Sequence, residues 1–361
     1  MENTKNRNTI NLILGAVIGV IAALLVHFGN PGNMGFCLAC FWRDITGALG
    51  LHSAGPVKYL RPEVIGFVLG AFISSMAAGE FKSRGGSSPI TRFTLGFTSM
   101  IGALVFLGCP LRLILRLGGG DLNALVGFAG FAVGILIGIY FLKKGFSLGR
   151  AYSQPKVAGY FMPAFVIILL VFLIAKPEFI GFSEEGPGSK HAPIIMSLVA
   201  GLIVGAIFQK RRLCTAGAIR DIFLVKDYGL FMGAFGIFLG ALIMNLILGQ
   251  FNLGFVDQPV AHNNHLGNFL GTLLLGFSSV LMGGCPIRQT VLSGQGDNDA
   301  TITVLGLIVG AAFAHNFGLA SSPKGVTTAG MVAVVICLVI NLIIASTSKR
   351  SNIWKKLIQE D

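Results

Sequence analysis

The chain has 361 residues, of which 53% are hydrophobic and only 12% are charged, whereas a soluble domain has about 25% charged residues. This composition excludes a disordered chain, a collagen-like repeat and a disulfide-rich scaffold. A mean hydropathy of +0.77 also argues against a soluble globular protein, because too little polar surface is left to face water. The sequence therefore predicts an all-α polytopic membrane protein, in which the 50 glycines serve helix packing and broken helices.

A membrane-spanning helix needs about 20 mostly apolar residues. Ten segments fit this description, although the third and the eighth are short: Ile10–Phe28, Pro62–Ala78, Phe93–Gly108, Leu122–Leu142, Val157–Ala175, Ala192–Phe208, Gly229–Leu248, Leu266–Met282, Ile302–Leu319 and Val326–Ala345. The first segment lacks a small-residue cleavage site after it, so we expect a span there and no signal peptide. The tail Lys349–Asp361 predicts an interfacial helix.

The positions of the basic residues predict the orientation. With ten spans and the N-terminus inside, 19 of the 27 Lys and Arg residues fall on the inner side, as the positive-inside rule requires. Both termini are therefore predicted to be cytoplasmic, in the cell inner membrane. The net charge of +12 is then a sign of topology, and nucleic acid is not an expected partner.

Two motifs occur twice. The segment Cys37–Ile45 recurs as Cys214–Ile222, and both copies read C-x5-R-D-I at an offset of 177. The segment Gly108–Arg112 recurs as Gly284–Arg288, and both copies read G-C-P-x-R at an offset of 176. Two motifs at nearly one offset indicate an internal duplication.

Five predicted crossings separate the copies, and an odd number turns the second copy upside down. Inverted repeats are typical of transporters, whose sites lie near the membrane midplane where broken helices meet. We expect a first repeat over residues 10–145, a linker with a central span over 146–190, the second repeat over 191–320, and a last span with the C-terminal helix over 321–361. The motif segments are too short and polar to span, which predicts four re-entrant helices: Gly35–Leu49, Pro110–Leu117, Leu213–Val225 and Pro286–Leu292.

The motifs combine sulfur with positive charge. Proline is favoured at the first helical position, so Cys109 and Cys285 are expected at helix starts, with Arg112 and Arg288 one turn further on. The glycine-rich turns that follow each copy could expose backbone N–H groups around Gly120 and Gly296 as anion-binding nests. Polarizable sulfur and positive potential suit a small anion that contains sulfur or selenium.

Simpler explanations stand beside these assignments. Cys337 lies within an apolar span and is expected only to pack. Cys37 and Cys40 form a lone CxxC, a weak redox or metal signal, and without a second CxxC or a suitably spaced His pair we expect neither a metal nor a cofactor.

The charged residues of the motifs also have simpler, structural explanations. Arg43–Asp44 and Arg220–Asp221 could be structural ion pairs that fix the re-entrant helices, although intramembrane ionisable residues are functional candidates. Asp121 and Asp297 more often cap helices than bind ligands. His262 and His265 fall in a polar loop and are expected to be solvated.

The repeated cysteine motifs, the ten-span outline and the R-D-I segments resemble the YeeE/YedE family of inner-membrane proteins, over about residues 10 to 345. The stretch Asn33–Asp44 is most similar to the selenium-associated YedE branch, and other members take up thiosulfate. The resemblance implies an hourglass of inverted repeats in which cysteines pass the anion along through S–H···S hydrogen bonds. By motif, those cysteines would be Cys37, Cys109, Cys214 and Cys285. Cys40 departs from the repeat, and a SirA/TusA-like sulfur carrier protein is an expected partner.

The leading hypothesis is therefore a permease for a small anion that contains selenium or sulfur, with selenium uptake as the first choice. We do not expect an enzyme. Thiosulfate transport is the alternative. No G-x4-G-K-[ST] motif for nucleotide binding occurs in the sequence. A further alternative is a membrane redox or persulfide-handling enzyme that uses Cys37–Cys40 as a dithiol or a motif cysteine as a persulfide carrier. A purely structural subunit would leave the repeated cysteines and arginines without a purpose.

Overall fold

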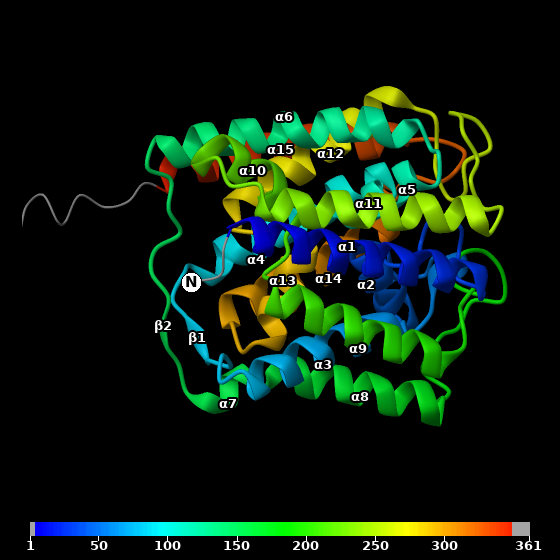
Figure 1. Ribbon diagram of the computed structural model, residues 1–361, viewed down its shortest axis with the longest axis horizontal. Coiled ribbons are helices and arrows are strands. Elements are labelled where there is room, and N and C mark those ends of the chain that lie inside the picture. Colours follow the sequence, from blue (N-terminus) through cyan, green and yellow to red (C-terminus); the bar gives the residue numbers. More distant parts are fainter. Residues whose placement is uncertain (1–3, 349–361) are drawn as a thin grey trace, which may run out of the picture.

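The computed structural model describes residues 4–348, which are almost entirely helical (Figure 1). Two strands of two residues, β1 (Arg84–Gly85) and β2 (Tyr152–Ser153), pair antiparallel. The expected interfacial helix Lys349–Asp361 lies outside the described residues. The helices are α1 (Thr4–His27), α2 (Leu38–Ala48), η1 (Gly55–Val57), α3 (Pro62–Ala77), α4 (Pro89–Phe106), α5 (Pro110–Gly118), α6 (Asn123–Lys143), α7 (Lys156–Gly159), α8 (Phe161–Ala175), α9 (Ile194–Lys210), α10 (Thr215–Val225), α11 (Gly229–Ile247), α12 (His265–Leu281), α13 (Pro286–Gly294), α14 (Asn298–Asn316) and α15 (Thr328–Thr347).

The outer surface of the helix bundle is apolar. Ile174 on α8, Ile247 on α11 and Ile336 on α15 expose 73%, 70% and 54% of their surface. Among residues 4–348, nine helical stretches are long and apolar enough to cross a membrane, and α8, with 15 residues, is a shorter apolar helix. The chain is therefore an all-α polytopic membrane protein, as its composition predicts.

The two short predicted spans are parts of broken helices. Phe93–Gly108 and Leu266–Met282 correspond to α4 and α12, and each is followed after a brief interruption by a nine-residue helix, α5 or α13. The combined stretches Pro89–Gly118 and His265–Gly294 each contain 30 residues. The interruption is what brings motif residues to the interior of the protein.

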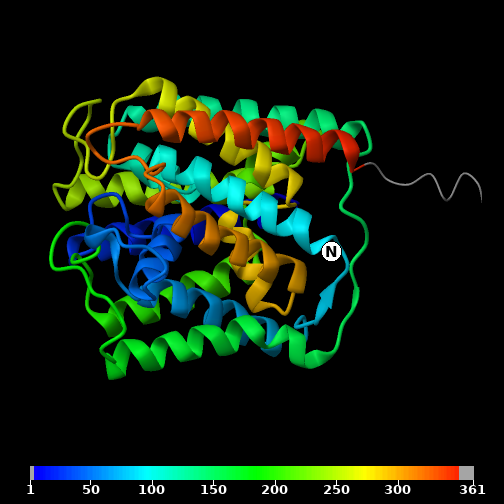
Figure 2. The same ribbon diagram turned by 180° about the vertical axis from the view of Figure 1, so that it is seen from behind.

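Helices from the two predicted repeats pack against each other in corresponding pairs. Helix α1 packs on α11 and α9 packs on α3; likewise α6 packs on α12 and α14 packs on α4. Exchange of the two halves converts each pair into another, so the helices of the two halves pack in corresponding ways. Helix α1 begins and α15 ends on one side of the molecule (Figure 1 and Figure 2). We call this side the terminal face and the other side the opposite face.

Glycines allow these helix pairs to touch through their backbones. A Cβ atom at Gly15 of α1 would meet the carbonyl of Gly233, and one at Gly236 of α11 would meet the carbonyl of Leu12. The pair α3 and α9 repeats the arrangement, with Gly66 against the carbonyl of Leu198. Close backbone approach at small residues is the main way in which helices associate in a membrane.

We predict that Gly236→Ala destabilises the protein by about 1–3 kcal/mol, because the added methyl group forces α1 and α11 apart. The measurement is the thermal unfolding midpoint of the detergent-solubilised protein. Gly55→Ala is the control, because a Cβ at Gly55 would have no atom within 4 Å. Equal midpoints for the two variants would contradict the prediction.

Candidate anion site at four short helices

Each short helix begins directly after a motif cysteine. Cys37, Cys109, Cys214 and Cys285 are the N-cap residues of α2, α5, α10 and α13. Their backbones are extended at the cap, which lets the following residues start a helix. Each of the four cysteines predicted to form the relay therefore occupies the same position, the N-cap, of its own short helix.

The caps are of two kinds. In α2 and α10 the cysteine sulfur accepts a hydrogen bond from a backbone N–H three residues later, at 3.4 Å from Cys40 N to Cys37 Sγ and 3.3 Å from Gly217 N to Cys214 Sγ. In α5 and α13 the residue after the cysteine is proline, which has no N–H to satisfy. Both solutions leave a helix N-terminus stable away from water.

The cysteines lie in two close pairs, one from each predicted repeat. The backbone N–H of Cys109 donates to Cys37 Sγ at 3.4 Å. The thiol of Cys214 lies 3.7 Å from Cys285 Sγ, which also accepts from the hydroxyl of Thr215 at 3.2 Å. All four cysteines are free thiols. Each pair therefore combines two helix N-termini, whose positive dipole ends favour an anion.

A polar contact joins the elements that carry the two pairs. The indole N–H of Trp42 on α2 donates to the hydroxyl of Thr290 on α13 at 3.2 Å, and both side chains are fully buried. The short helices of the two halves are therefore in direct contact inside the protein.

Arg112 lies completely buried beside the first pair. Its guanidinium donates to the carbonyls of Asn33 and Leu107, and Nη1 lies 3.6 Å from Cys40 Sγ. Cys40, which has no counterpart in the second repeat, thus contacts the motif arginine. Cys40 is a free thiol, and the described residues include no group of three or more His, Cys, Asp or Glu side chains that could hold a metal ion.

Arg288 occupies the corresponding position beside the second pair, but it borders a cavity of about 460 Å³ on the terminal face. Cys214 also borders this cavity and is 8% exposed, whereas Cys285 is fully buried. The cavity is strongly basic, with two carboxylates, Asp221 and Asp227, against the following Lys and Arg residues: Arg7, Lys210, Arg211, Arg212, Arg220 and Arg288.

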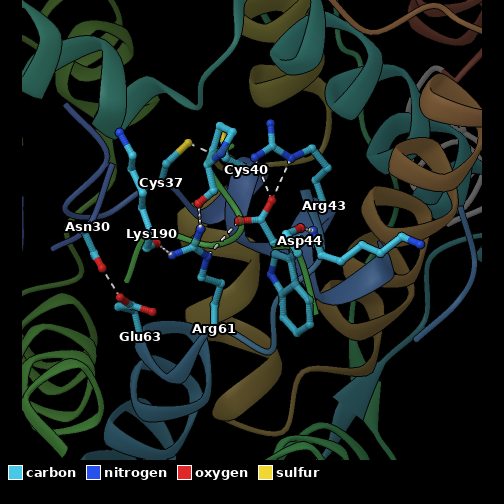
Figure 3. A network of polar contacts seen from close by, with 12 residues as sticks. Asn30, Cys37, Cys40, Arg43, Asp44, Arg61, Glu63 and Lys190 are labelled. Atoms are coloured by element: carbon cyan, nitrogen blue, oxygen red, sulfur yellow. Dashed lines mark hydrogen bonds and ion pairs between the residues drawn. The ribbon is translucent and has the colours of Figure 1, made fainter. Parts of the chain in front are cut away.

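The R-D motifs form ion pairs in both halves. Arg43 donates to Asp44 Oδ1 at 2.9 and 2.6 Å, and Arg220 donates to Asp221 Oδ1 at 2.7 Å. Figure 3 shows that Asp44 lies between Arg43 and a second arginine, Arg61, which donates to its Oδ2 at 2.7 Å. Arg220 is partly exposed toward the cavity. The Arg43–Asp44 ion pair is therefore buried, whereas the Arg220–Asp221 ion pair is accessible to an ion in the cavity.

Arg61 is a site residue that the sequence did not reveal. It donates to the carbonyls of Pro187 and Lys190, and thereby ties α2 to the segment before α9. Next to it, buried Glu63 accepts from Asn30 at 2.8 Å (Figure 3). The repeat gives no signal for these residues, because the second half has no charged side chain at the matching positions.

The predicted glycine nests are placed differently from what we expected. The N–H groups of Gly120 and Gly296 donate to the carbonyls of Leu117 and Ser293, so they are used within the turns. These glycines also follow the C-terminal ends of α5 and α13, and a nine-residue helix, about 13 Å long, separates them from the cysteines. Their positive φ angles, 91° and 90°, fit a turn that ends a helix.

Three further expectations have clear outcomes. Asp297 caps α14, with Oδ1 accepting from Ala300 N at 3.0 Å, as predicted. Cys337 is buried within α15, as predicted for a packing residue. The expectation that His262 is solvated is wrong: it is 2% exposed, and Nε2 lies 2.8 Å from the carbonyl of Val105. Burial occurs because its loop folds over α4.

Part of the chain is similar to known proteins of sulfur transport. Residues 210–353 match the family described as "Sulphur transport". The chain is 33% identical over 114 residues to the thiosulfate transporter TsuA of Spirochaeta thermophila. The aligned stretch covers 32% of this chain and 34% of that protein. It is 24% identical over 104 residues to TsuA of Escherichia coli, which covers 28% and 29%.

The matched stretches span about a third of the length of these two relatives. The selenium-associated branch stays a prediction, because both relatives carry the thiosulfate name. The family match includes Cys214, Cys285 and Arg288, which are the residues of the second motif pair. These partial matches, together with the repeated cysteine motifs, support the resemblance of the chain to the YeeE/YedE family, and the family match itself covers residues 210–353.

Proposed function

We propose that the chain is a membrane transporter for a small sulfur-containing anion of the thiosulfate class, and that the four N-cap cysteines form its pathway. The observation that carries this proposal is their arrangement: each cysteine caps a short helix, and the cysteines lie in two close pairs. The names of the relatives support thiosulfate as the substrate.

The electrostatics suit an anion at both pairs. Two helix N-termini contribute partial positive charges at each pair, and Arg112 or Arg288 adds a full charge. A thiol is a weak hydrogen-bond donor with a polarizable sulfur. It can therefore contact the terminal sulfur of thiosulfate while binding it less strongly than a directly bonded cation would. Weak, repeated sites favour passage over retention.

The relay runs across the membrane in a definite direction in this proposal. The basic residues concentrate on the terminal face, which the positive-inside rule assigns to the cytoplasm. The cavity at Arg288 and Cys214 is then the inner exit, in the cell inner membrane. Its basic lining also offers a docking place for the SirA/TusA-like sulfur carrier that the family resemblance implies.

A selenium-containing anion is the second candidate substrate. The residues around Cys37 resemble the selenium-associated branch, and Cys40 adds a sulfur atom that the second repeat lacks. Thiosulfate and the selenium anions are small and negatively charged and present a polarizable chalcogen atom, so one site can accept both classes, and their relative rates of uptake decide between the two candidates.

We predict that Cys109→Ala and Cys285→Ala each lower uptake of labelled thiosulfate at least about tenfold, because loss of a hydrogen bond to a charged group costs about 1.5–3 kcal/mol. Uptake is measured in cells that lack other thiosulfate transporters. Cys337→Ala is the control, since this thiol lies buried in α15, and it should retain uptake. Full uptake by both motif variants would end the relay proposal.

We also predict that turnover leaves no sulfur or selenium bound to the protein. Thiosulfate, selenite and selenide are supplied in parallel, and uptake is compared with the intact mass of the protein after exposure. Faster uptake of a selenium species would favour the second candidate. A mass increase that Cys37→Ala or Cys40→Ala removes would favour the redox or persulfide enzyme instead.

A further inference from the structure

The two halves differ in the loop that lies on the same face as each motif arginine. The loop between α3 and α4 lies on the terminal face, and the loop between α11 and α12 lies on the opposite face (Figure 1). Both loops attach in the same way to the turn after a short helix: Arg84 bridges to Asp297 and Gly254 bridges to Asp121, each in parallel. The bridges fix equivalent points from which the loops can be compared.

Beyond these points the loop on the opposite face is longer. Four residues, 85–88, lead from Arg84 to the start of α4, whereas ten residues, 255–264, lead from Gly254 to the start of α12. The extra length includes the segment 255–260, which we call the lid. Pro259 of the lid lies against Gly32, so a Cβ on Gly32 would collide with the proline ring.

The lid lies over Arg112. Its carbonyls accept from Nη2 of this arginine, at 3.0 Å from Val260 and 3.4 Å from Pro259. The other acceptors around the guanidinium are backbone carbonyls and Cys40 Sγ. Within the described chain Arg112 has no carboxylate in its contacts, so a full positive charge is buried against neutral groups alone, which is energetically costly.

The equivalent arginine on the terminal face is uncovered. Arg288 borders the 460 Å³ cavity, and its Nη1 atom is shielded from solvent without a hydrogen-bond partner among the described residues. The same motif therefore exists in two states in one molecule: open toward an ion at Arg288, and occupied by lid carbonyls at Arg112.

The backbone of the lid is strained. Asp257 and Val260 have φ angles of 57° and 51°, in the left-handed region that a β-branched residue such as valine seldom adopts. Such a conformation is energetically costly and persists only while its surroundings enforce it. The carbonyl of Val260 is one of the two lid groups that accept from Arg112.

We propose that Arg112 is a second anion-binding site on the opposite face, and that the lid, residues 255–260, is its removable cover. A small oxyanion replaces the carbonyls of Pro259 and Val260 on Arg112 Nη2, the strain at Val260 is released, and the lid moves away. This inference rests on the proposed transport function for its ligand, thiosulfate, but the movement of the lid can be tested without any substrate.

The test locks the lid with a disulfide between Gly32→Cys and Pro259→Cys. A Cβ at Gly32 would lie 2.4 Å from the Cβ of residue 259, and a disulfide needs about 3.8 Å, so the pair forms after a small outward shift of the lid. Right-side-out vesicles are oxidised, and the labelling of Cys37 and Cys40 by a membrane-impermeant maleimide is followed by peptide mass spectrometry. Both thiols are fully buried in the closed structure. We expect slow labelling in the reduced pair and a drop of at least about tenfold after oxidation. Wild type and the two single variants, oxidised in the same way, are the controls.

Two further measurements complete the test. Arg112→Gln should raise the labelling of Cys40, because glutamine cannot hold both lid carbonyls. Oxidation of the pair should stop thiosulfate uptake, and reduction should restore it. Equal labelling of the double variant before and after oxidation, or no labelling of the reduced double variant, would contradict the proposal that the lid moves. Labelling that responds to the lock in a protein that does not take up thiosulfate would instead refute the proposed substrate and leave the lid standing.

Discussion

Backbone contact between helices of opposite halves is the constraint on which the rest of the structure depends. Water does not drive helices together within a bilayer, so association relies on close packing and on interhelical polar contacts. Glycines in α1, α3, α9 and α11 let carbonyls and Cα atoms of partner helices touch. Because the partners come from different halves, neither half can enclose its own short helices. The interior that shelters the broken backbone exists only when both halves are assembled.

That shelter explains the chemistry of the four N-caps. A helix that begins at membrane depth leaves backbone N–H groups that lipid cannot satisfy. A cysteine sulfur accepts one of them in α2 and α10, and proline removes one in α5 and α13. Sulfur is a weak acceptor, so these caps stabilise the ends less than serine or aspartate would. We infer that the weaker cap is retained because an anion takes over part of its role.

The sequence predicted the elements that depend on local pattern. Hydropathy located the spans, and the duplicated motifs located the short helices and their cysteines. It did not predict interactions between distant, unrepeated residues, such as Arg61 with Asp44 or Glu63 with Asn30. It also assigned Gly120 and Gly296 to anion nests, because glycine content cannot tell where a turn directs its N–H groups. The polar residues around His262 in the sequence predicted a solvated side chain, but the loop passes over α4 and buries it.

The difference between Arg112 and Arg288 has a physical meaning for transport. If both arginines faced open cavities, an anion pathway would connect the two sides at once, and flow would follow the membrane potential outward at about 2.3 kcal/mol per charge and 100 mV. A cover at one end removes this leak. Lid carbonyls suit this role because they hydrogen-bond the buried guanidinium without balancing its charge, so in this proposal an anion competes for Arg112 more strongly than water does. In the proposed mechanism, the extra residues of one loop thus close one of two similar anion sites until an anion displaces them from Arg112.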